Sequence, residues 1–234
     1  MNFSKINSEP YKKIGLIGGM GSAATIATYK KIIEISQSNH KLSPHLIINN
    51  LPQENIFDQL EDSLATMICH GIEDLANAGV SVVGISCNTA HVYTKSIRVE
   101  TKRRKIEFVS IIDSVINHCV RSGFQRIGIL ATPKGCDIYR EAIRAGSMVD
   151  VLPSFEQQQE INQVIRAVLE GRSGYSQREC LDGVKDCMYE QGCETVILGC
   201  TELPLVFGDL TPTGYISSIT VLAESLLQVA HRLN

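Results

Sequence analysis

The chain has 234 residues, of which 44 % are hydrophobic, and its formal net charge at pH 7 is −3. This length and apolar content suffice for one large domain or two small ones with a sizeable buried core. A chain this close to neutrality gives no electrostatic reason to expect nucleic acid or an anionic membrane as a partner.

Two features bear on the compartment in which the protein works. No stretch of about 18 apolar residues occurs, so no membrane span is predicted. Residues 1–13 are polar and lack the apolar core of a signal peptide, which predicts a cytoplasmic protein. In that reducing compartment the eight cysteines are expected as free thiols. Because no two of them form a C-x-x-C pair, no metal site is predicted.

Short apolar runs alternate with amphipathic helical stretches along the whole chain. The first predicted helix follows a glycine turn at 18–21 and places Ile26, Tyr29 and Ile33 on one face. Strands are predicted at 13–17, 46–49, 80–86, 108–111, 126–130, 149–152 and 195–198. Helices are predicted at 22–36, 63–77, from residue 90 onward, and at 115–121, 136–144, 161–169, 179–190 and 218–232. Such alternation predicts an α/β fold whose parallel sheets are covered by helices on both faces.

One segment of the chain is echoed 113 residues later. Residues 82–89, VVGISCNT, resemble residues 195–202, TVILGCTE. Each is an apolar strand followed by a small residue, a cysteine and a threonine, and each comes after a helix that ends in glycine. The echo predicts two similar α/β lobes related by a pseudo-twofold axis. We place residues 1–112 and 217–234 in the first lobe and residues 113–216 in the second.

The echoed cysteines, Cys87 and Cys200, are the strongest candidates for chemistry. Both follow the carboxyl end of a predicted strand, where ligands bind in parallel α/β sheets. The turn after such a strand offers unpaired N–H groups, which lower a thiol pKa and bind carboxylates. Two thiols across a cleft suit inversion of a carbon acid, because one removes a proton while the other returns one to the opposite face. The other six cysteines are expected to be structural.

Four stretches resemble the cofactor-independent aspartate/glutamate racemase superfamily, and within it the aspartate racemase branch. They are residues 14–21, 86–91, 126–132 and 196–203, and they lie in the family's order. The resemblance implies two α/β lobes, an active site in the cleft between them, and a homodimer. It also implies racemisation of an amino acid, aspartate first and glutamate second, without pyridoxal phosphate or any other cofactor. In this reading Cys87 and Cys200 are the two acid/base thiols.

The resemblance also assigns residues that bind the substrate. Its amino-carboxylate end would meet Met20, Asn88, Thr89 and Thr201. Arg172 lies where related enzymes often carry a basic residue that contacts the substrate, although it also fits a solvated loop arginine.

Three positions depart from the family pattern or have an open role. Glu202 stands where glutamate racemases carry a histidine, and it is expected either to polarise the thiol of Cys200 or to be a structural carboxylate. The loop 49–54 contains no lysine or arginine, although members that act on acidic amino acids commonly have a basic residue there. His91, one turn after Cys87, is expected to cap a helix or to sit in the core.

Two other functions stay open at this point. Residues 19–24 match G-x-G-x-x-A after a strand, which is typical of a dinucleotide-dependent oxidoreductase. However, the second strand ends in Asn49 and Asn50, where such enzymes carry an acidic residue that binds ribose. The other alternative is a catalytically silent two-lobed protein that binds a small acid, which would not need both cysteines.

Overall fold

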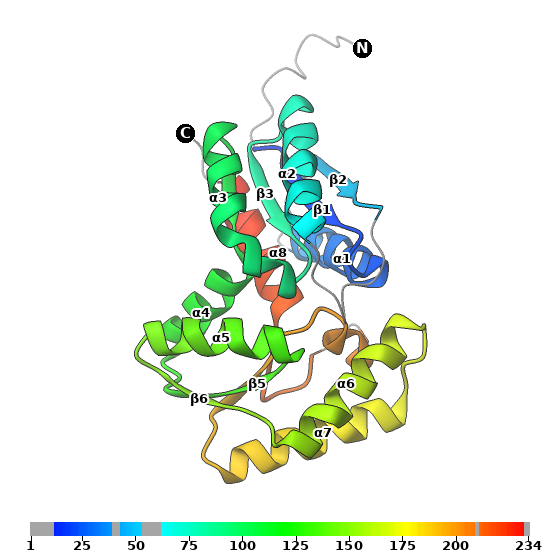
Figure 1. The fold of residues 1–234 in the computed structure, drawn as a ribbon, viewed down its shortest axis with the longest axis vertical. Helices are drawn as coiled ribbons and strands as arrows, with labels where there is room; N and C mark the ends of the chain where they lie inside the picture. The colour runs from blue at the N-terminus through cyan, green and yellow to red at the C-terminus, as the bar shows by residue number, and fades with distance from the viewer. Residues whose placement is uncertain (1–11, 39–42, 53–61, 209–210, 232–234) are drawn as a thin grey trace.

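The computed structural model describes residues 12–38, 43–52, 62–208 and 211–231, which form two lobes with one parallel sheet each (Figure 1). The first sheet has the order β2-β1-β3-β4 and the second the order β6-β5-β7-β8, so the two lobes repeat one topology. The strands of the first sheet are β1 (Ile14–Gly18), β2 (Leu46–Asn50), β3 (Val82–Ile85) and β4 (Glu107–Val109). Those of the second are β5 (Arg126–Leu130), β6 (Val149–Val151), β7 (Thr195–Leu198) and β8 (Tyr215–Ser217). The predicted two-lobed α/β fold is confirmed.

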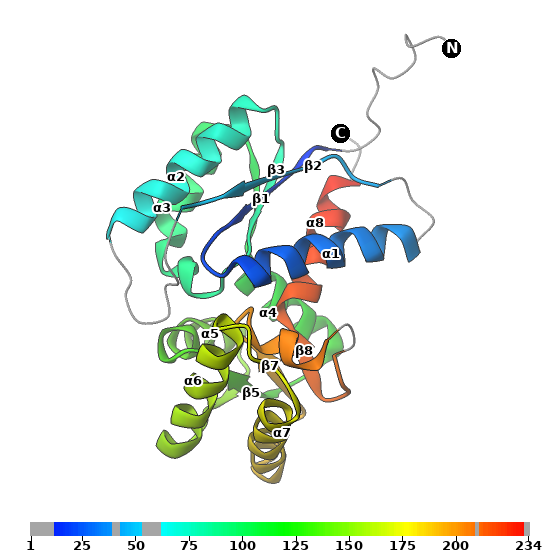
Figure 2. The same ribbon diagram turned by 90° about the vertical axis from the view of Figure 1, so that its right-hand side faces the viewer.

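Four helices lie between the sheets and join them in one hydrophobic core (Figure 2). They are α1 (Ser22–Ser38), α4 (Ile111–Ser122), α5 (Pro133–Ala145) and α8 (Ser218–Ala230). Because this core takes side chains from both sheets, the exact limits of the two lobes stay a prediction. Burial of so many aliphatic side chains, at about 25 cal/mol per Å² of apolar surface, stabilises the mutual position of the lobes.

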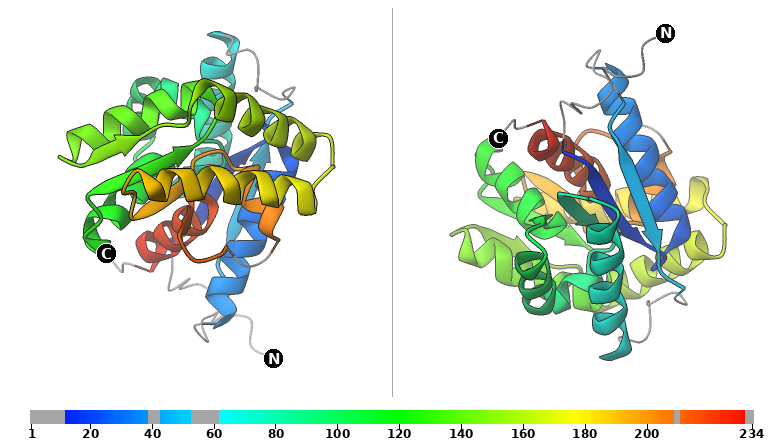
Figure 3. Two further views of the ribbon diagram at one scale, coloured as in Figure 1. Left: turned by 90° about the horizontal axis from the view of Figure 1, so that it is seen from below. Right: turned by 90° about the horizontal axis from the view of Figure 1, so that it is seen from above.

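The outer face of each sheet carries its own pair of helices and its own cluster of buried side chains. In the first lobe these are α2 (Asp62–Asn77) and α3 (Thr94–Arg103). In the second lobe they are α6 (Phe155–Leu169) and α7 (Tyr175–Glu190), which Figure 3 shows from below. Both faces of each sheet are therefore covered, as buried parallel strands require. None of the described helices is long and apolar enough to cross a membrane.

Several predicted boundaries are wrong by a few residues, and side-chain caps explain most of them. Helix α5 starts three residues early because the Thr132 hydroxyl accepts the N–H of Gly135. Helix α6 starts six residues early at a capping box formed by Ser154 and Gln157. The segment expected as the end of a strand at Ile111 is instead the first turn of α4.

Two further differences concern short elements near the ends of β3 and β7. The helix expected from Ala90 is split into a 3-10 helix, η2 (Thr89–Tyr93), and α3. Two short elements were not predicted: the 3-10 helix η3 (Leu203–Phe207) and the strand β8.

Helix α1 buries a different face from the one its large apolar residues mark. Its buried side chains include Ala24, Thr28 and Ile32, whereas Ile26 is 66 % and Tyr29 44 % exposed. Helix α1 packs against α8, and the hydroxyls of its buried Thr28 and of Ser86, which follows β3, lie 2.6 Å apart. A polar contact to the neighbouring strand end, and not side-chain hydrophobicity alone, thus helps to select the buried face.

Candidate active site

A small pocket lies where the carboxyl ends of β1, β3, β5 and β7 meet between the lobes. Each of these four strands contributes a residue that follows it directly, and α6 adds two apolar side chains. The lining residues are Met20, Cys87, Asn88, Thr89, Thr132, Ile165, Leu169, Cys200, Thr201 and Glu202. This is the place where open parallel sheets bind ligands.

The turn after β1 brings Met20 to the pocket. Gly19 has a φ of +95°, and a Cβ there would lie 2.1 Å from the carbonyl oxygen of Leu51. Only glycine fits such a left-handed position beside a backbone carbonyl. The turn that the sequence also allowed as a dinucleotide-binding loop therefore serves to place Met20, which is 4 % exposed, against the thiols.

The first thiol, Cys87, follows β3 at the start of η2. Burial raises its pKa to about 12, although the backbone N–H groups of Ala90 and Thr89 lower that pKa and so favour the thiolate. Its carbonyl oxygen accepts a hydrogen bond from Nδ1 of His91 at 2.9 Å. Nε2 of the same ring accepts the N–H of Ile111, the first residue of α4, at 3.3 Å. His91 therefore links the backbone at Cys87 to α4, one of the four helices between the sheets.

Both hydrogen bonds define the state of His91. A ring that donates from one nitrogen and accepts at the other is the neutral tautomer. Burial lowers the pKa of His91 to about 4, which agrees with that state. The ring also stacks on Phe108, with centroids 5.8 Å apart. The predicted core histidine is what the structure contains, and its role is to hold the Cys87 backbone.

The second thiol, Cys200, follows β7 and has a carboxyl partner. Its Sγ donates to Oε2 of Glu202 at 3.0 Å, and the Thr201 hydroxyl donates to the same oxygen at 3.2 Å. Burial and the neighbouring Glu202 raise the pKa of Cys200 well above its usual range. Burial also raises the pKa of Glu202, although the hydrogen bonds it accepts act in the opposite direction. The thiol and the carboxyl form a coupled pair in which a proton has two neighbouring sites.

Glu202 is held in place from the first lobe. A Cβ on Gly21 would lie 2.2 Å from Oε1 of Glu202, so the carboxyl rests directly on the glycine backbone. Gly21 also has a φ of +153°, which side chains rarely adopt. The glycine turn after β1 thus shapes both ends of the pocket, since it places Met20 and makes room for Glu202.

Hydrogen bonds cross from one lobe to the other beside the thiols. The hydroxyls of Thr89 and Thr132 lie 3.2 Å apart. The buried Tyr139 hydroxyl donates to Oδ1 of Asn88 at 2.7 Å, and Nδ2 of Asn88 donates to Oγ of Ser218 at 3.2 Å. The orientation of the Asn88 amide is therefore set by two partners, which leaves the second N–H of Nδ2 for a ligand.

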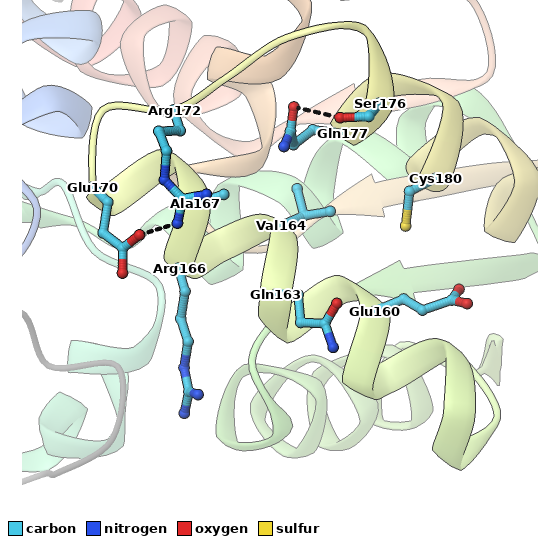
Figure 4. Close-up of a pocket in the computed structure, with 10 residues that line it drawn as sticks. All are labelled: Glu160, Gln163, Val164, Arg166, Ala167, Glu170, Arg172, Ser176, Gln177 and Cys180. Carbon is cyan, nitrogen blue, oxygen red and sulfur yellow. Dashed lines mark hydrogen bonds and ion pairs between the residues drawn. The ribbon is translucent and has the colours of Figure 1, made fainter.

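The structure brings together seven of the eight residues predicted for the site. They are Met20, Cys87, Asn88, Thr89, Cys200, Thr201 and Glu202. The eighth, Arg172, lies just after α6 in a separate groove between α6 and α7, where its guanidinium pairs with Glu170 (Figure 4). The side chain of Arg172 is 67 % exposed, and its contact with substrate stays a prediction.

Three lining residues were absent from the predicted site. Thr132 could have been found, because it follows β5 at the position that Cys87 and Cys200 take after their strands. Ile165 and Leu169 carried no such signal, since apolar residues one turn apart on a helix usually mark only a core-facing stripe.

The arrangement defines what chemistry is available. Two thiols from different lobes open into one buried pocket, and short donors from Asn88, Thr89, Thr132 and Thr201 surround them. The amide N–H and the hydroxyl groups can donate to the carboxylate of an amino acid, and the hydroxyl oxygens and the Glu202 carboxyl can accept from its ammonium group. The thiols suit removal and return of a proton at the carbon between them.

Comparisons with known proteins agree with this geometry. Residues 17–226 match the sequence model of the Asp/Glu/Hydantoin racemase family. The chain is 24 % identical to a broad-specificity amino-acid racemase of Bacillus subtilis over 223 residues, which cover 91 % of this chain and 95 % of that protein.

Two solved structures extend the likeness to three dimensions. One is an aspartate racemase homologue from Pyrococcus horikoshii OT3, with a TM-score of 0.80 and 26 % identity over 94 % of this chain and 100 % of that one. The other is the aspartate racemase of Picrophilus torridus, with a TM-score of 0.74 and 25 % identity over 95 % and 96 % of the two chains. The likeness thus extends over nearly the whole chain and includes both strand ends that carry the thiols.

Proposed function

The chain belongs to the Asp/Glu/Hydantoin racemase family, as its motifs predicted, and we propose that it inverts the α-carbon of an amino acid with two cysteines and no cofactor. The observation that carries the proposal is the single buried pocket shared by Cys87 and Cys200. Because the two thiols come from equivalent strand ends of two similar lobes, the proposal has one thiol act on each side of the α-carbon.

The proton transfers balance in both directions. For one enantiomer the Cys87 thiolate takes the α-proton, and the Cys200 thiol gives its proton to the opposite face of the planar carbanion. After these two transfers Cys87 is a thiol and Cys200 is a thiolate, and the product dissociates. The other enantiomer reacts by the same steps in reverse, so a turnover in either direction prepares the enzyme for the opposite one.

The polar residues around the thiols stabilise the charge that develops. When the α-proton leaves, negative charge spreads onto the carboxylate of the substrate. The second N–H of Asn88, and whichever of the Thr89 and Thr132 hydroxyls accepts the hydrogen bond between them, can donate to the carboxylate. Donors held in place in this way stabilise the developing charge, which is the main electrostatic means of lowering a barrier.

Binding of the substrate favours the thiolate form that the reaction needs. Burial raises the pKa of both thiols and so favours their protonated forms. The α-ammonium group of a bound amino acid brings a positive charge beside them, and a neighbouring opposite charge lowers a thiol pKa. Glu202 can accept the proton that Cys200 gives up, since the two groups are already hydrogen-bonded.

The test is a racemisation and exchange screen without added pyridoxal phosphate. The enzyme, dialysed and treated with EDTA and hydroxylamine, is incubated in deuterated water with single L- and D-amino acids. We expect loss of optical activity together with incorporation of deuterium at the α-carbon. Activity that hydroxylamine abolishes and pyridoxal phosphate restores would contradict the proposal, and binding of amino acids without any exchange would indicate a silent binding protein.

Two further expectations belong to the proposal. The homodimer implied by the family resemblance is tested by light scattering at the enzyme's working concentration. A cytoplasmic location is the second expectation and is tested by cell fractionation.

A further inference from the structure

The wall of the thiol pocket has an unusual charge for a site that would bind an acidic side chain. None of the described lining residues is a lysine, an arginine or a histidine. Among the lining residues that the structure describes, the one ionisable group besides the thiols is the carboxyl of Glu202, which is 5 % exposed and lies between Gly21 and Cys200. The described wall is therefore neutral when Glu202 is protonated and negative when it is ionised.

Cations close by in sequence are not among the described residues that line this wall. Arg166 and Arg172 line the separate groove between α6 and α7 (Figure 4), and Arg172 is paired with Glu170 there. The segment that follows β2, residues 51–61, contains no lysine or arginine in its sequence. A second carboxylate brought into the pocket would thus lack a counter-charge and would stand near Glu202, and burying an unpaired charge is strongly unfavourable.

The rest of the pocket wall, beyond the polar residues, is apolar. Ile165 and Leu169 lie one turn apart on α6, so both point to the same side of that helix. Ile165 is 1 % exposed, and Leu169 packs beside the same hydrophobic cluster that includes Cys200. With the carboxylate group held by N–H and O–H donors and the ammonium group by hydroxyl or carboxyl oxygens, the side chain of the substrate is left to contact these two residues and Met20.

We propose that this enzyme acts on amino acids with an uncharged, largely aliphatic side chain and discriminates against aspartate and glutamate. The inference rests on the proposed racemase function and names the substrate class of that same pocket. Ile165 and Leu169 bind the side chain, and Glu202 together with the missing cation excludes a second carboxylate. The acidic substrate that the family resemblance predicts is accordingly the poorer one.

A panel of substrates tests the proposal with the wild-type enzyme. Rates of deuterium incorporation are measured for L-methionine, L-leucine, L-aspartate, L-glutamate and L-lysine. We expect kcat/KM for methionine or leucine to exceed that for aspartate by at least about 30-fold, the effect of a buried charge left without its partner. Aspartate, glutamate or lysine as the best substrate would overturn the inference while leaving the racemase function intact. No exchange with any amino acid would instead contradict the racemase function itself.

A charge placed on the apolar wall sharpens the test. Leu169→Lys adds a cation where the side chain of the substrate is expected, and Leu169→Gln is the matched control with similar polarity and no charge. We expect the ratio of aspartate to methionine kcat/KM to rise at least 10-fold in Leu169→Lys compared with Leu169→Gln. Equal ratios in the two variants would show that this wall does not contact the side chain, and circular dichroism confirms that both variants are folded.

Discussion

The two strand ends that carry the thiols have the same backbone arrangement but differ in the side chains that follow each cysteine. Cys87 and Cys200 both follow a buried central strand and both precede a 3-10 helix, η2 or η3. Two residues after the first cysteine is Thr89, whose hydroxyl faces Thr132 in the other lobe. Two residues after the second is Glu202, whose carboxyl accepts the thiol proton.

The fourth residue after each cysteine differs as well. At the first end it is His91, which ties the Cys87 carbonyl to α4. At the second end it is Pro204, which lies in the first turn of η3 and has no side-chain donor or acceptor. A repeated backbone therefore holds two chemically unequal acid/base groups: one thiol beside backbone donors and a neutral histidine, and one thiol coupled to a carboxyl group.

The largest effect is expected when either thiol is replaced. Serine differs from cysteine by one atom, but its hydroxyl is far too weak an acid to supply the base near neutral pH. Cys87→Ser and Cys200→Ser should each lower racemisation by about 10³-fold or more, within the range of general acid–base catalysis. Each variant keeps one thiol, so each should still exchange the α-proton of one enantiomer, and the two variants should select opposite enantiomers.

A third cysteine offers a matched control for that experiment. Cys136 is also buried, its pKa is also raised to about 12 by burial, and it does not line the pocket. Cys136→Ser should racemise within a few-fold of the wild-type rate. Exchange of the same enantiomer by both active-site variants would exclude a scheme with one thiol on each face.

The histidine that distinguishes the first end should make stability depend on pH. The pKa of His91 is lowered from 6.5 to about 4, so between these values the unfolded chain binds a proton that the folded chain does not. Stability is then present above pH 6.5 and is lost as pH falls toward 4, by about 3 kcal/mol for this one group. His91→Gln removes the titration. Urea titrations at pH 7 and pH 4 give the drop in the free energy of unfolding between these two pH values for each protein. That drop should be about 3 kcal/mol smaller for His91→Gln than for the wild type. Equal drops would contradict the assignment.

The carboxyl that distinguishes the second end should affect one proton transfer more than the other. Since two enantiomers have equal free energies, kcat/KM must be the same in both directions, so the asymmetry is visible only in isotope exchange. Glu202→Gln should slow exchange of the enantiomer deprotonated by Cys200 at least about 10-fold more than exchange of the other. Because the pKa of Glu202 is raised, the difference between wild type and variant should shrink as pH falls and Glu202 takes up a proton. Equal slowing of both enantiomers would place Glu202 in a structural role.

Much of this comparison could be predicted from the sequence, because the chemistry is concentrated in local motifs. The echo of 82–89 in 195–202 predicted the two lobes and both thiols, and the residues directly after each cysteine lie where that echo indicates. The alternation of strands and helices predicted the parallel sheets. These features depend on periodicity and on short-range order along the chain, which a single sequence contains.

The rest depends on contacts between distant segments. The apolar wall of Ile165 and Leu169 follows from how α6 packs beside η3, and no local pattern separates such residues from ordinary core. Helix α1 buries Ala24 and Thr28 on the side where both are hydrogen-bonded to Ser86, 58 or more residues away along the chain. The loop after α6 has the arginine that the family pattern suggests, but Glu170 two residues earlier pairs with it. Likewise, nothing in the sequence joins Asn88 to Tyr139, 51 residues later.

That last contact yields the smallest expected effect, and it concerns both strand ends at once. The Tyr139 ring packs on Gly199, since a Cβ there would lie 2.7 Å from it, and its hydroxyl donates to Asn88 at the other end. Tyr139→Phe keeps the ring and removes the hydroxyl, so Asn88 loses the donor that orients its amide. We expect a loss of about 1 kcal/mol in stability, and a rise in KM of about 5-fold with a smaller change in kcat. Tyr215→Phe is the matched control, because its hydroxyl donates to Asp182 in the second lobe and does not contact the pocket. That control should lose similar stability and keep its KM, whereas an equal rise in KM in both variants would show that Tyr139 does not position Asn88 for the substrate.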